Sequence, residues 1–141
     1  MKVAIYSRAL DYDQQQEVQL LFDQLAAENV EPIIYHPFYQ KMQHGLSFPD
    51  KIAVFSSTDD LDDSVDFLIS LGGDGTLLDT VSLVRDKNIP VLGVNFGRLG
   101  FLASLGRNEL ITTVKALVKR TVVIDKRSLI HLDSSQPLFG E

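Results

Sequence analysis

The sequence predicts an α/β fold, with a mainly parallel sheet and helices on both of its faces, over residues 1–120. Short apolar runs of strand length alternate along the chain with segments whose apolar side chains recur at helical spacing. Strands that alternate with helices form parallel sheets covered on both faces, so a Rossmann-like domain is expected. Residues 121–141 break the pattern and read as the beginning of a β-rich second domain. The chain is therefore expected to be the front part of a larger protein.

The first strand is expected at Lys2–Ser7 and the second at residues 31–36, because both are short apolar runs. Between them, residues 13–29 carry apolar side chains at helical spacing with polar residues in between. Asp11 or Asp13 is suited to cap the start of that helix. The recurring apolar positions of the helix are Val18, Leu21, Phe22 and Leu25.

The middle of the chain is more mixed. A helix is expected near residues 38–43, followed by a turn at Gly45 and a short strand at residues 52–55. The acidic stretch 59–63 leads into an apolar strand that ends at Leu71. The spacing of these acidic residues does not fit a calcium loop, so a solvated loop with a helix cap is expected.

The second half continues the alternation. Residues 88–90 interrupt a helix, and an apolar strand is expected at residues 90–94. An amphipathic helix is expected at residues 109–119. Two further strands, at residues 121–125 and 128–132, have a more alternating pattern and are assigned to the β-rich second domain.

Composition narrows the class of protein. The 141 residues carry 19 acidic and 13 basic side chains, a net charge of -6, which disfavours a nucleic-acid partner. There is no cysteine, and the histidines have no ligand-like spacing, so no metal site is expected in the chain itself. No apolar run approaches the roughly 20 residues that span a bilayer. We expect no membrane partner and a cytoplasmic location. The histidines are His36, His44 and His131.

The pentapeptide Gly72-Gly73-Asp74-Gly75-Thr76 follows directly after the apolar run 67–71 and precedes a helix expected to begin near Thr76. Glycines let a ligand approach the backbone closely, and amides at a helix start favour an anion. Asp74 would repel a phosphate, so it needs either a cation between them or a role as base toward an attacking hydroxyl. Both explanations point to phosphoryl transfer.

A second glycine-rich segment, Asn95-Phe96-Gly97-Arg98-Leu99-Gly100-Phe101-Leu102, follows the strand at residues 90–94. Ligands of open parallel sheets bind at the carboxyl ends of the strands. Both glycine-rich segments fall at that edge, so we expect them to form two sides of one site. Ser7 and Arg8 follow the first strand at the same edge, where contact with phosphates and an ordinary surface turn both remain open.

Each candidate residue also has a purely structural explanation. Asp74 could act only as the N-cap of the following helix. Asn95 could hold a turn, because Asn tolerates left-handed backbone conformations. Arg98 could neutralise a phosphate or simply be an exposed loop arginine. Phe101 could pack in the core rather than against a ligand.

Together, the two glycine-rich segments resemble those of the NAD kinases. Gly-Gly-Asp-Gly also occurs in diacylglycerol and sphingosine kinases and in phosphofructokinases, whereas the Leu-Gly-Phe-Leu ending at residues 99–102 favours the NAD kinases. The resemblance implies transfer of the γ-phosphate of ATP to the 2′-hydroxyl of the adenosine ribose of NAD, giving NADP. It also implies Mg²⁺ or another divalent metal that accompanies ATP.

The resemblance assigns roles to individual residues. Asp74 would be the general base, and Asn95 and Phe101 would lie beside the NAD site. The glycines of the pentapeptide and Thr76 would line the nucleotide phosphates. These phosphate-lining residues are Gly72, Gly73, Gly75 and Thr76, with Arg98 as a further candidate.

The chain departs from the resemblance in one large respect. NAD kinases have a β-rich second domain with an Asn-Glu pair that grips the nucleotide, and neither is found before Glu141. We therefore expect this chain by itself to be inactive, and a homo-oligomer to form when the second domain is present. A lipid kinase of the diacylglycerol type and a non-catalytic module that senses NAD or NADP remain as alternatives.

Overall fold

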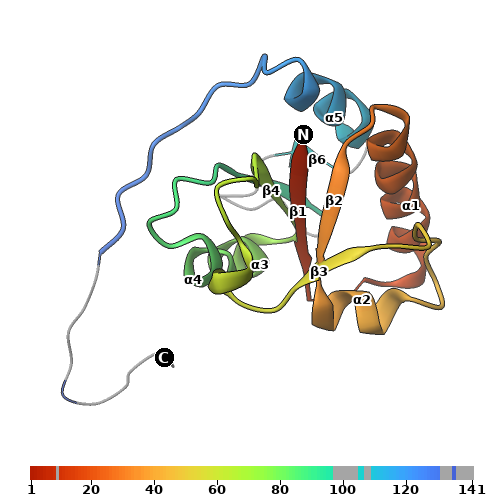
Figure 1. The fold of residues 1–141 in the computed structure, drawn as a ribbon, viewed down its shortest axis with the longest axis horizontal. Coiled ribbons are helices and arrows are strands. Elements are labelled where there is room, and N and C mark those ends of the chain that lie inside the picture. Colours follow the sequence, from red (N-terminus) through yellow and green to blue (C-terminus); the bar gives the residue numbers. More distant parts are fainter. Residues whose placement is uncertain (9, 97–104, 107–108, 131–134, 136–141) are drawn as a thin grey trace.

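A computed structural model describes residues 1–8, 10–96, 105–106, 109–130 and 135 of the chain. These form a six-stranded sheet in the order β3-β2-β1-β4-β5-β6, in which every paired strand is parallel (Figure 1). The expected parallel α/β fold is confirmed. The strands are β1 Lys2–Ser7, β2 Glu31–Tyr35, β3 Ala53–Phe55, β4 Phe67–Gly72, β5 Val91–Asn95 and β6 Leu105–Gly106.

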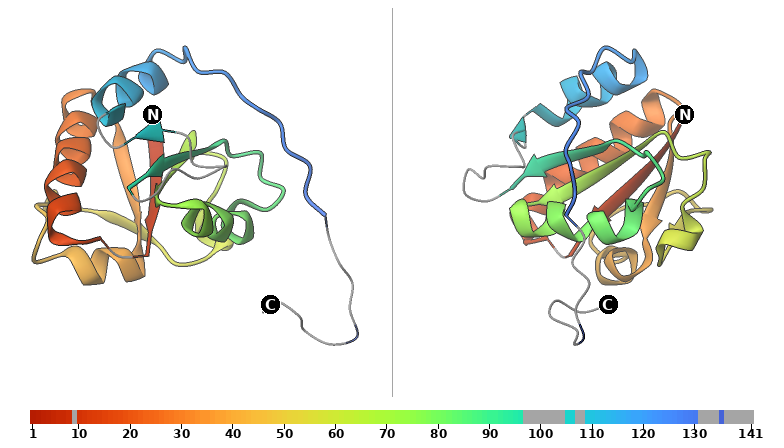
Figure 2. Two further views of the ribbon diagram at one scale, coloured as in Figure 1. Left: turned by 180° about the vertical axis from the view of Figure 1, so that it is seen from behind. Right: turned by 90° about the vertical axis from the view of Figure 1, so that its left-hand side faces the viewer.

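Helices cover both faces of the sheet (Figures 1 and 2). The first two, α1 and α2, pack with α5 on one face, and α4 packs on the other together with the segment that follows η1. The chain thus winds outward from β1 through β2 to β3, then returns to β4 beside β1 and continues in the opposite direction. The helices are α1 Tyr12–Ala27, α2 His36–Met42, the 3₁₀ turn η1 Thr58–Asp60, α3 Asp74–Asp79, α4 Val81–Val84 and α5 Leu110–Val118.

The apolar character of β1 follows from its central position in the sheet. Side chains alternate between the two faces of a strand, so Val3 and Ile5 join the core under α1, while Ala4 and Tyr6 join the core on the opposite face. A strand that is buried on both faces has no solvent-exposed side, so the sequence of β1 is a nearly continuous apolar run.

The long first helix begins close to where the sequence predicts. Asp11 is the N-cap of α1, and the Gln14 side chain accepts a hydrogen bond from the Asp11 backbone N–H at 2.8 Å, which completes a capping box. The four predicted apolar positions of the helix are all buried. The helix ends at Ala27, two residues early, and Asn29 takes a left-handed conformation with φ 55° before β2 begins.

Two predictions at the C-terminal end are wrong within the described residues. Residues 121–125 and 128–130 form no strand, and this segment leads away from the sheet (Figure 1). Val123 and Ile130 are each 97% exposed. A strand forms only by pairing with a neighbour, and these residues have no neighbouring strand to pair with in the described structure. Conversely, the short β6 was not expected from the sequence.

Among the described residues, no helix combines the length and the apolar character that crossing a membrane requires.

Candidate functional site

The pentapeptide lies at the switch point of the sheet, which is the place where the strand order reverses. Gly72 ends β4, Gly73 is the N-cap of α3, and Asp74 is the first helical residue. The strands β1 and β4 run side by side but lead to connections on opposite sides of the sheet. The crevice outside the carboxyl ends of two such strands is where open α/β sheets bind their ligands.

The two leading glycines have different surroundings. A Cβ added to Gly72 would lie 2.7 Å from the Cβ of Thr76, closer than real side chains approach. Gly72 is thus required by the packing of the turn itself, and Thr76 is buried. A Cβ added to Gly73 would have no neighbour within 4 Å among the residues that the structure describes. Within the described part of the chain, the backbone at Gly73 is therefore bordered by open space that a ligand can enter.

Asp74 is half-buried and occupies the first turn of α3, with the exposed Gly75 after it. The helix begins two residues earlier than the sequence predicts, because Gly73 takes the extended N-cap conformation. This excludes the explanation of Asp74 as the N-cap. The helix is only six residues long, so its dipole adds little to the attraction of an anion. What remains distinctive is a carboxylate at the switch point of the sheet.

The second glycine-rich segment begins beside the first. Asn95, at the end of β5, is buried and lies opposite Gly72 in the register of the two strands. The Phe96 N–H donates a hydrogen bond of 2.9 Å to the carbonyl oxygen of Gly72. The predicted juxtaposition is thus confirmed for the beginning of the segment. Arg98 and Phe101 lie outside the described residues.

Sequence reasoning missed a polar network that joins β1 to α3. The Arg8 guanidinium pairs with the Asp79 carboxylate through two hydrogen bonds, Nε to Oδ2 at 2.6 Å and Nη2 to Oδ1 at 2.8 Å. The Tyr6 hydroxyl donates to the same Oδ2 at 2.8 Å. The only hint in the sequence was the position of Arg8 after the first strand, since Asp79 lies 71 residues away.

The network shifts the ionisation of its members. Hydrogen bonds from Arg8, and secondarily from Tyr6, hold the pKa of the Asp79 carboxyl below its ordinary value. Burial, together with the hydrogen bond to Asp79, raises the pKa of the Tyr6 phenol well above its ordinary value. Asp79 is therefore ionised and Tyr6 is protonated at neutral pH, so the ion pair with Arg8 is fully formed.

No three side chains of the kinds that ligate metals come together in the part of the chain that the structure describes. Asp74 is a carboxylate that could share a cation with a phosphate, but these residues by themselves do not form a metal cage. Mg²⁺ is commonly held by one or two carboxylates together with the phosphates of a substrate. Among the described residues, Asp74 could supply one carboxylate ligand to such a metal.

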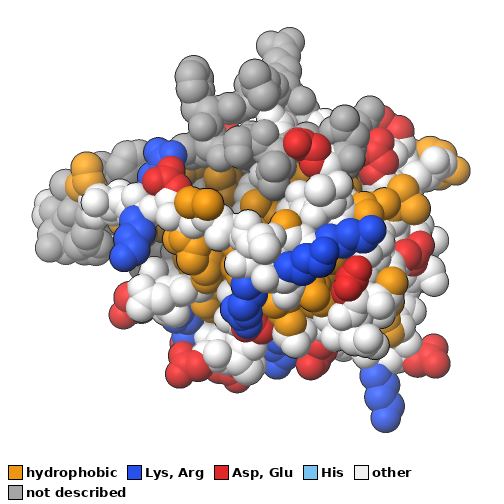
Figure 3. All heavy atoms as spheres, turned by 90° about the horizontal axis from the view of Figure 1, so that it is seen from above, with side chains coloured by type: hydrophobic (Ala, Val, Ile, Leu, Met, Phe, Trp, Pro, Cys, Tyr) orange, Lys and Arg blue, Asp and Glu red, His pale blue; other side chains and the backbone are white. Residues whose placement is uncertain are grey.

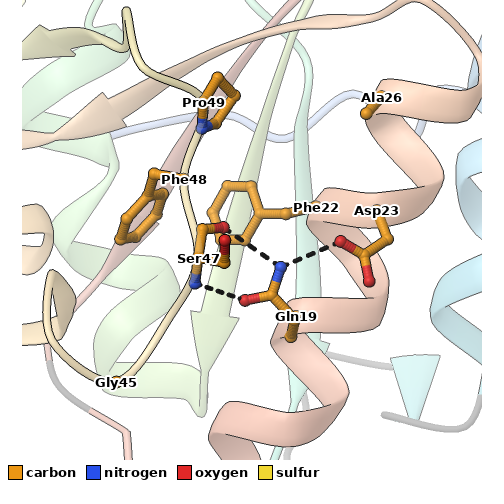
Figure 4. A pocket seen from close by; sticks show the side chains of 8 residues that line it. All are labelled: Gln19, Phe22, Asp23, Ala26, Gly45, Ser47, Phe48 and Pro49. Carbon is orange, nitrogen blue, oxygen red and sulfur yellow. Dashed lines mark hydrogen bonds between the residues drawn. The ribbon is translucent and has the colours of Figure 1, made fainter.

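A hollow of about 520 Å³ lies elsewhere, between α1 and the loop after α2 (Figure 4). The Gln19 amide donates to Ser47 O and accepts from Ser47 N, at 3.2 and 2.7 Å, and also donates to Asp23. The Phe22 and Phe48 rings meet edge to face beside it. No lining residue belongs to a strand or to α3, so the hollow is separate from the switch point. The lining residues are Gln19, Phe22, Asp23, Ala26, Gly45, Ser47, Phe48 and Pro49.

Comparison with known proteins identifies relatives along most of the chain. A curated NAD kinase of Flavobacterium psychrophilum is 36% identical over 132 residues, covering 94% of this chain and 45% of the relative. A curated NAD kinase of Cytophaga hutchinsonii is 35% identical over 142 residues, covering 100% of this chain and 48% of the relative. The chain thus spans about half the length of these curated relatives.

The fold is also found in a solved structure. The crystal structure of a yeast NADH kinase, complexed with NADH, matches 84% of this chain and 38% of its own, with a TM-score of 0.67 and 19% identity. At this identity the likeness establishes the fold. The sequence model of the ATP-NAD kinase N-terminal domain matches residues 14–122, which include the pentapeptide and the whole of the second glycine-rich segment. The chain belongs to the ATP-NAD kinase family.

Proposed function

We propose that this chain is the nucleotide-binding part of an NAD kinase, which transfers the γ-phosphate of ATP to the 2′-hydroxyl of the adenosine ribose of NAD. The observation that carries the proposal is the position of Asp74: a carboxylate in the first turn of α3, at the switch point of the sheet and next to the open backbone of Gly73. The relatives named NAD kinase support the same reaction.

In the reaction, the ribose 2′-oxygen attacks the γ-phosphorus and a new P–O bond forms. The bond from the γ-phosphorus to the bridging oxygen breaks, and ADP leaves with that electron pair. The proton of the 2′-hydroxyl passes to the Asp74 carboxylate and then to solvent, so the products are NADP, ADP and a proton. A positioned base typically contributes about 10²–10⁴-fold to such a step.

The remaining site residues bind rather than react. The open backbone at Gly73 and the exposed Gly75 would lie against the nucleotide phosphates, with Gly72 and Thr76 supporting the turn. Asn95 would lie beside NAD. ATP would enter as its Mg²⁺ complex, because alignment and charge neutralisation lower the remaining barrier. Phe101 against the nucleotide and Arg98 near a phosphate complete the proposed site.

The proposal extends to the organisation of the complete enzyme. Residues 1–120 would form the nucleotide-binding domain, and residues 121–141 would begin a β-rich second domain. The relatives are about twice as long as this chain, which leaves room for such a domain. We propose that the second domain completes the NAD site and supports a homo-oligomer, that the chain alone is inactive, and that the enzyme acts in the cytoplasm.

The test is NADP formation from NAD and Mg-ATP by the full-length gene product and by its Asp74→Asn variant. Loss of the base should lower kcat by about 10²–10⁴-fold, while NAD binding is retained because Asn is isosteric with Asp. If the variant turns over as fast as the parent, the assignment of Asp74 is wrong.

Assays of diacylglycerol phosphorylation and of NAD and NADP binding on the same full-length protein address the alternative functions. If the folded full-length protein makes no NADP but phosphorylates diacylglycerol, a lipid kinase replaces the proposal. If it binds NAD or NADP and catalyses neither reaction, it is a sensor. The comparisons favour neither alternative, because the curated relatives named above are NAD kinases.

A further inference from the structure

We propose that Arg8 binds the phosphate chain of Mg-ATP, and that Asp79 and Tyr6 hold its guanidinium in place. The inference rests on the proposed function for the identity of the nucleotide. It is drawn from the network between β1 and α3, which the reaction as described above does not use.

The end of β1 is fixed against the end of β4. Ser7 lies opposite Leu71 in the register of the two strands, and its buried hydroxyl donates a hydrogen bond of 2.8 Å to the Leu71 carbonyl oxygen. Arg8 is the next residue along, and Gly72 follows Leu71. Arg8 therefore leaves the sheet at the same level as the pentapeptide, on the other side of the switch point.

The guanidinium presents one edge to Asp79 and another to the turn. Nε and Nη2 bind the carboxylate, and Nη2 also lies 3.4 Å from the carbonyl oxygen of Gly75. A Cβ built on Gly75 would lie 3.7 Å from Nη1. Arginine has five N–H donors in a planar fork, so the ion pair leaves donors on the Nη1 edge for a phosphate oxygen. The Arg8 side chain is 60% exposed, so a ligand can reach it.

Asp79 and Gly75 are four residues apart on α3 and therefore share one face of the helix. An added Cβ at position 75 would be in ordinary van der Waals contact with the guanidinium, so Arg8 lies directly over this face of the helix. From the neighbouring strand, the Tyr6 hydroxyl fixes the same Asp79 oxygen that Nε binds. The carboxylate is thus held by two side chains, Tyr6 in β1 and Arg8 directly after it. Asp79 is a positioning residue, since it acts through the two hydrogen bonds that orient Arg8.

Stability alone is a weak reason for this arrangement, because exposed ion pairs contribute little to folding. The chain supplies a matched comparison at the opposite edge of the sheet. Arg120 pairs with Asp66 at 2.7 Å, and the two side chains are 63% and 25% exposed. Asp66 immediately precedes β4 and accepts a hydrogen bond from the Lys2 backbone N–H at 2.9 Å. Figure 3 views the molecule from this edge, where acidic and basic side chains are interspersed with hydrophobic ones.

The first experiment measures Mg-ATP binding by titration calorimetry and steady-state kinetics on the full-length protein. Arg8→Ala should raise the Kd and KM for Mg-ATP at least about tenfold, the loss expected for one charge-assisted hydrogen bond. The KM for NAD should stay unchanged. Arg8→Lys should recover part of the loss, because lysine restores the charge without the fork. Arg120→Ala should change neither constant.

The second experiment tests the positioning role with a double-mutant cycle. Asp79→Asn should raise the KM for Mg-ATP in the parent and have little effect when Arg8 is already alanine. If Asp79 acted only through stability, its effect would persist in the Arg8→Ala background and would appear equally in the KM for NAD. Tyr6→Phe should give a smaller change of the same kind.

The outcomes separate this inference from the proposed function. If NADP forms but the Kd for Mg-ATP is the same in the parent, Arg8→Ala and Arg8→Lys, the inference is overturned and the function stands. If no NADP forms but Mg-ATP binding depends on Arg8, the function is overturned and the inference stands. If Arg8→Ala fails to fold, the Kd for Mg-ATP is measured on Arg8→Lys and Asp79→Asn instead. A Kd equal to that of the parent in both variants would refute the role of Arg8.

Discussion

Gly72 and Gly73 are adjacent in the pentapeptide, but glycine has a different structural explanation at each position. An added Cβ at Gly72 would meet Thr76, whereas one at Gly73 would enter open space. The requirement at Gly72 comes from the packing of the turn. At Gly73 no atom of the described residues accounts for the missing side chain, and a close ligand would.

This difference yields a first prediction at the scale of residues. Gly72→Ala should lower the free energy of unfolding by about 1–3 kcal/mol, as overpacked sites typically do. Gly73→Ala should lower it by less than about 1 kcal/mol, the difference between glycine and alanine at an N-cap. In contrast, Gly73→Ala should weaken nucleotide binding. Urea unfolding of the 141-residue chain and Mg-ATP titration of the full-length protein measure the two effects. Equal loss of stability in both variants would contradict the explanation.

A second residue-scale prediction concerns pH. The folded-state pKa of Asp79 is below its ordinary value, chiefly because of the hydrogen bonds from Arg8. Its contribution to stability is therefore present above the unfolded-state pKa of about 3.9 and is lost as the pH falls through the lower folded-state pKa. The difference in unfolding free energy between the parent chain and Asp79→Asn should be constant from pH 7 to about 5 and shrink below about 4.

Urea unfolding of both chains at pH 7 and pH 3 measures that difference, with other carboxylates such as Asp66 common to both. A difference that grows on acidification would show that Asp79 is not stabilised in its ionised form by Arg8.

The residue scale also shows where sequence reasoning reached its limit. Asp74 could be recognised as a candidate from the sequence because the whole glycine-rich motif is contiguous. The pairing of Arg8 with Asp79 was not, because 71 residues separate them and only the adjacency of β1 and β4 brings them together.

At the scale of elements, the neighbouring strands β1 and β4 each bury a serine close to the site. Ser7 donates to the Leu71 carbonyl, whereas the Ser70 hydroxyl has no hydrogen-bond partner among the described residues. Both side chains are at most 1% exposed. A buried hydroxyl is stabilising only when it is paired, so the two serines should respond differently to removal.

Ser7→Ala should lower the free energy of unfolding by about 1 kcal/mol, and Ser70→Ala should leave it unchanged or raise it. Thermal or urea unfolding of the two single variants, whose substitutions are chemically identical, gives the comparison directly. A loss at position 70 as large as that at position 7 would mean that the Ser70 hydroxyl is paired in solution.

Most elements could be predicted because each carries a local signal. In α1 this is the 3.6-residue spacing together with the Asp11 cap, and in β1 it is an apolar run buried on both faces. The failures occurred where the local signal was too short or where tertiary pairing did not follow it. The two-residue β6 is too short to show a pattern, and residues 121–130 carry a strand-like pattern but pair with no strand in the described structure.

At the scale of the whole molecule, the packed α/β unit ends before the exposed C-terminal segment. Val122 still packs against the main core, whereas Val123 is 97% exposed. Truncation after Val122 should therefore leave the urea midpoint of the chain unchanged. Truncation after Glu109 should destabilise it severely, because it removes α5 and the buried Leu110, Val114 and Leu117.

Circular dichroism during urea unfolding of the two truncated chains measures both effects. A large loss of stability on truncation after Val122 would place residues beyond it in the core and would contradict the proposed boundary near residue 120.

By itself, the sequence determined the class of fold, most strands and helices, and the pentapeptide with its carboxylate. These follow from local periodicity, capping and glycine placement, which act over a few residues. Only the tertiary structure decided the order of the strands, and with it which residues lie beside the pentapeptide. Because β4 returns to lie beside β1, Arg8, Tyr6 and Asp79 meet at one edge of the sheet, and Asn95 lies opposite Gly72. Such contacts depend on how segments far apart in the sequence pack together, and local sequence patterns do not predict this packing.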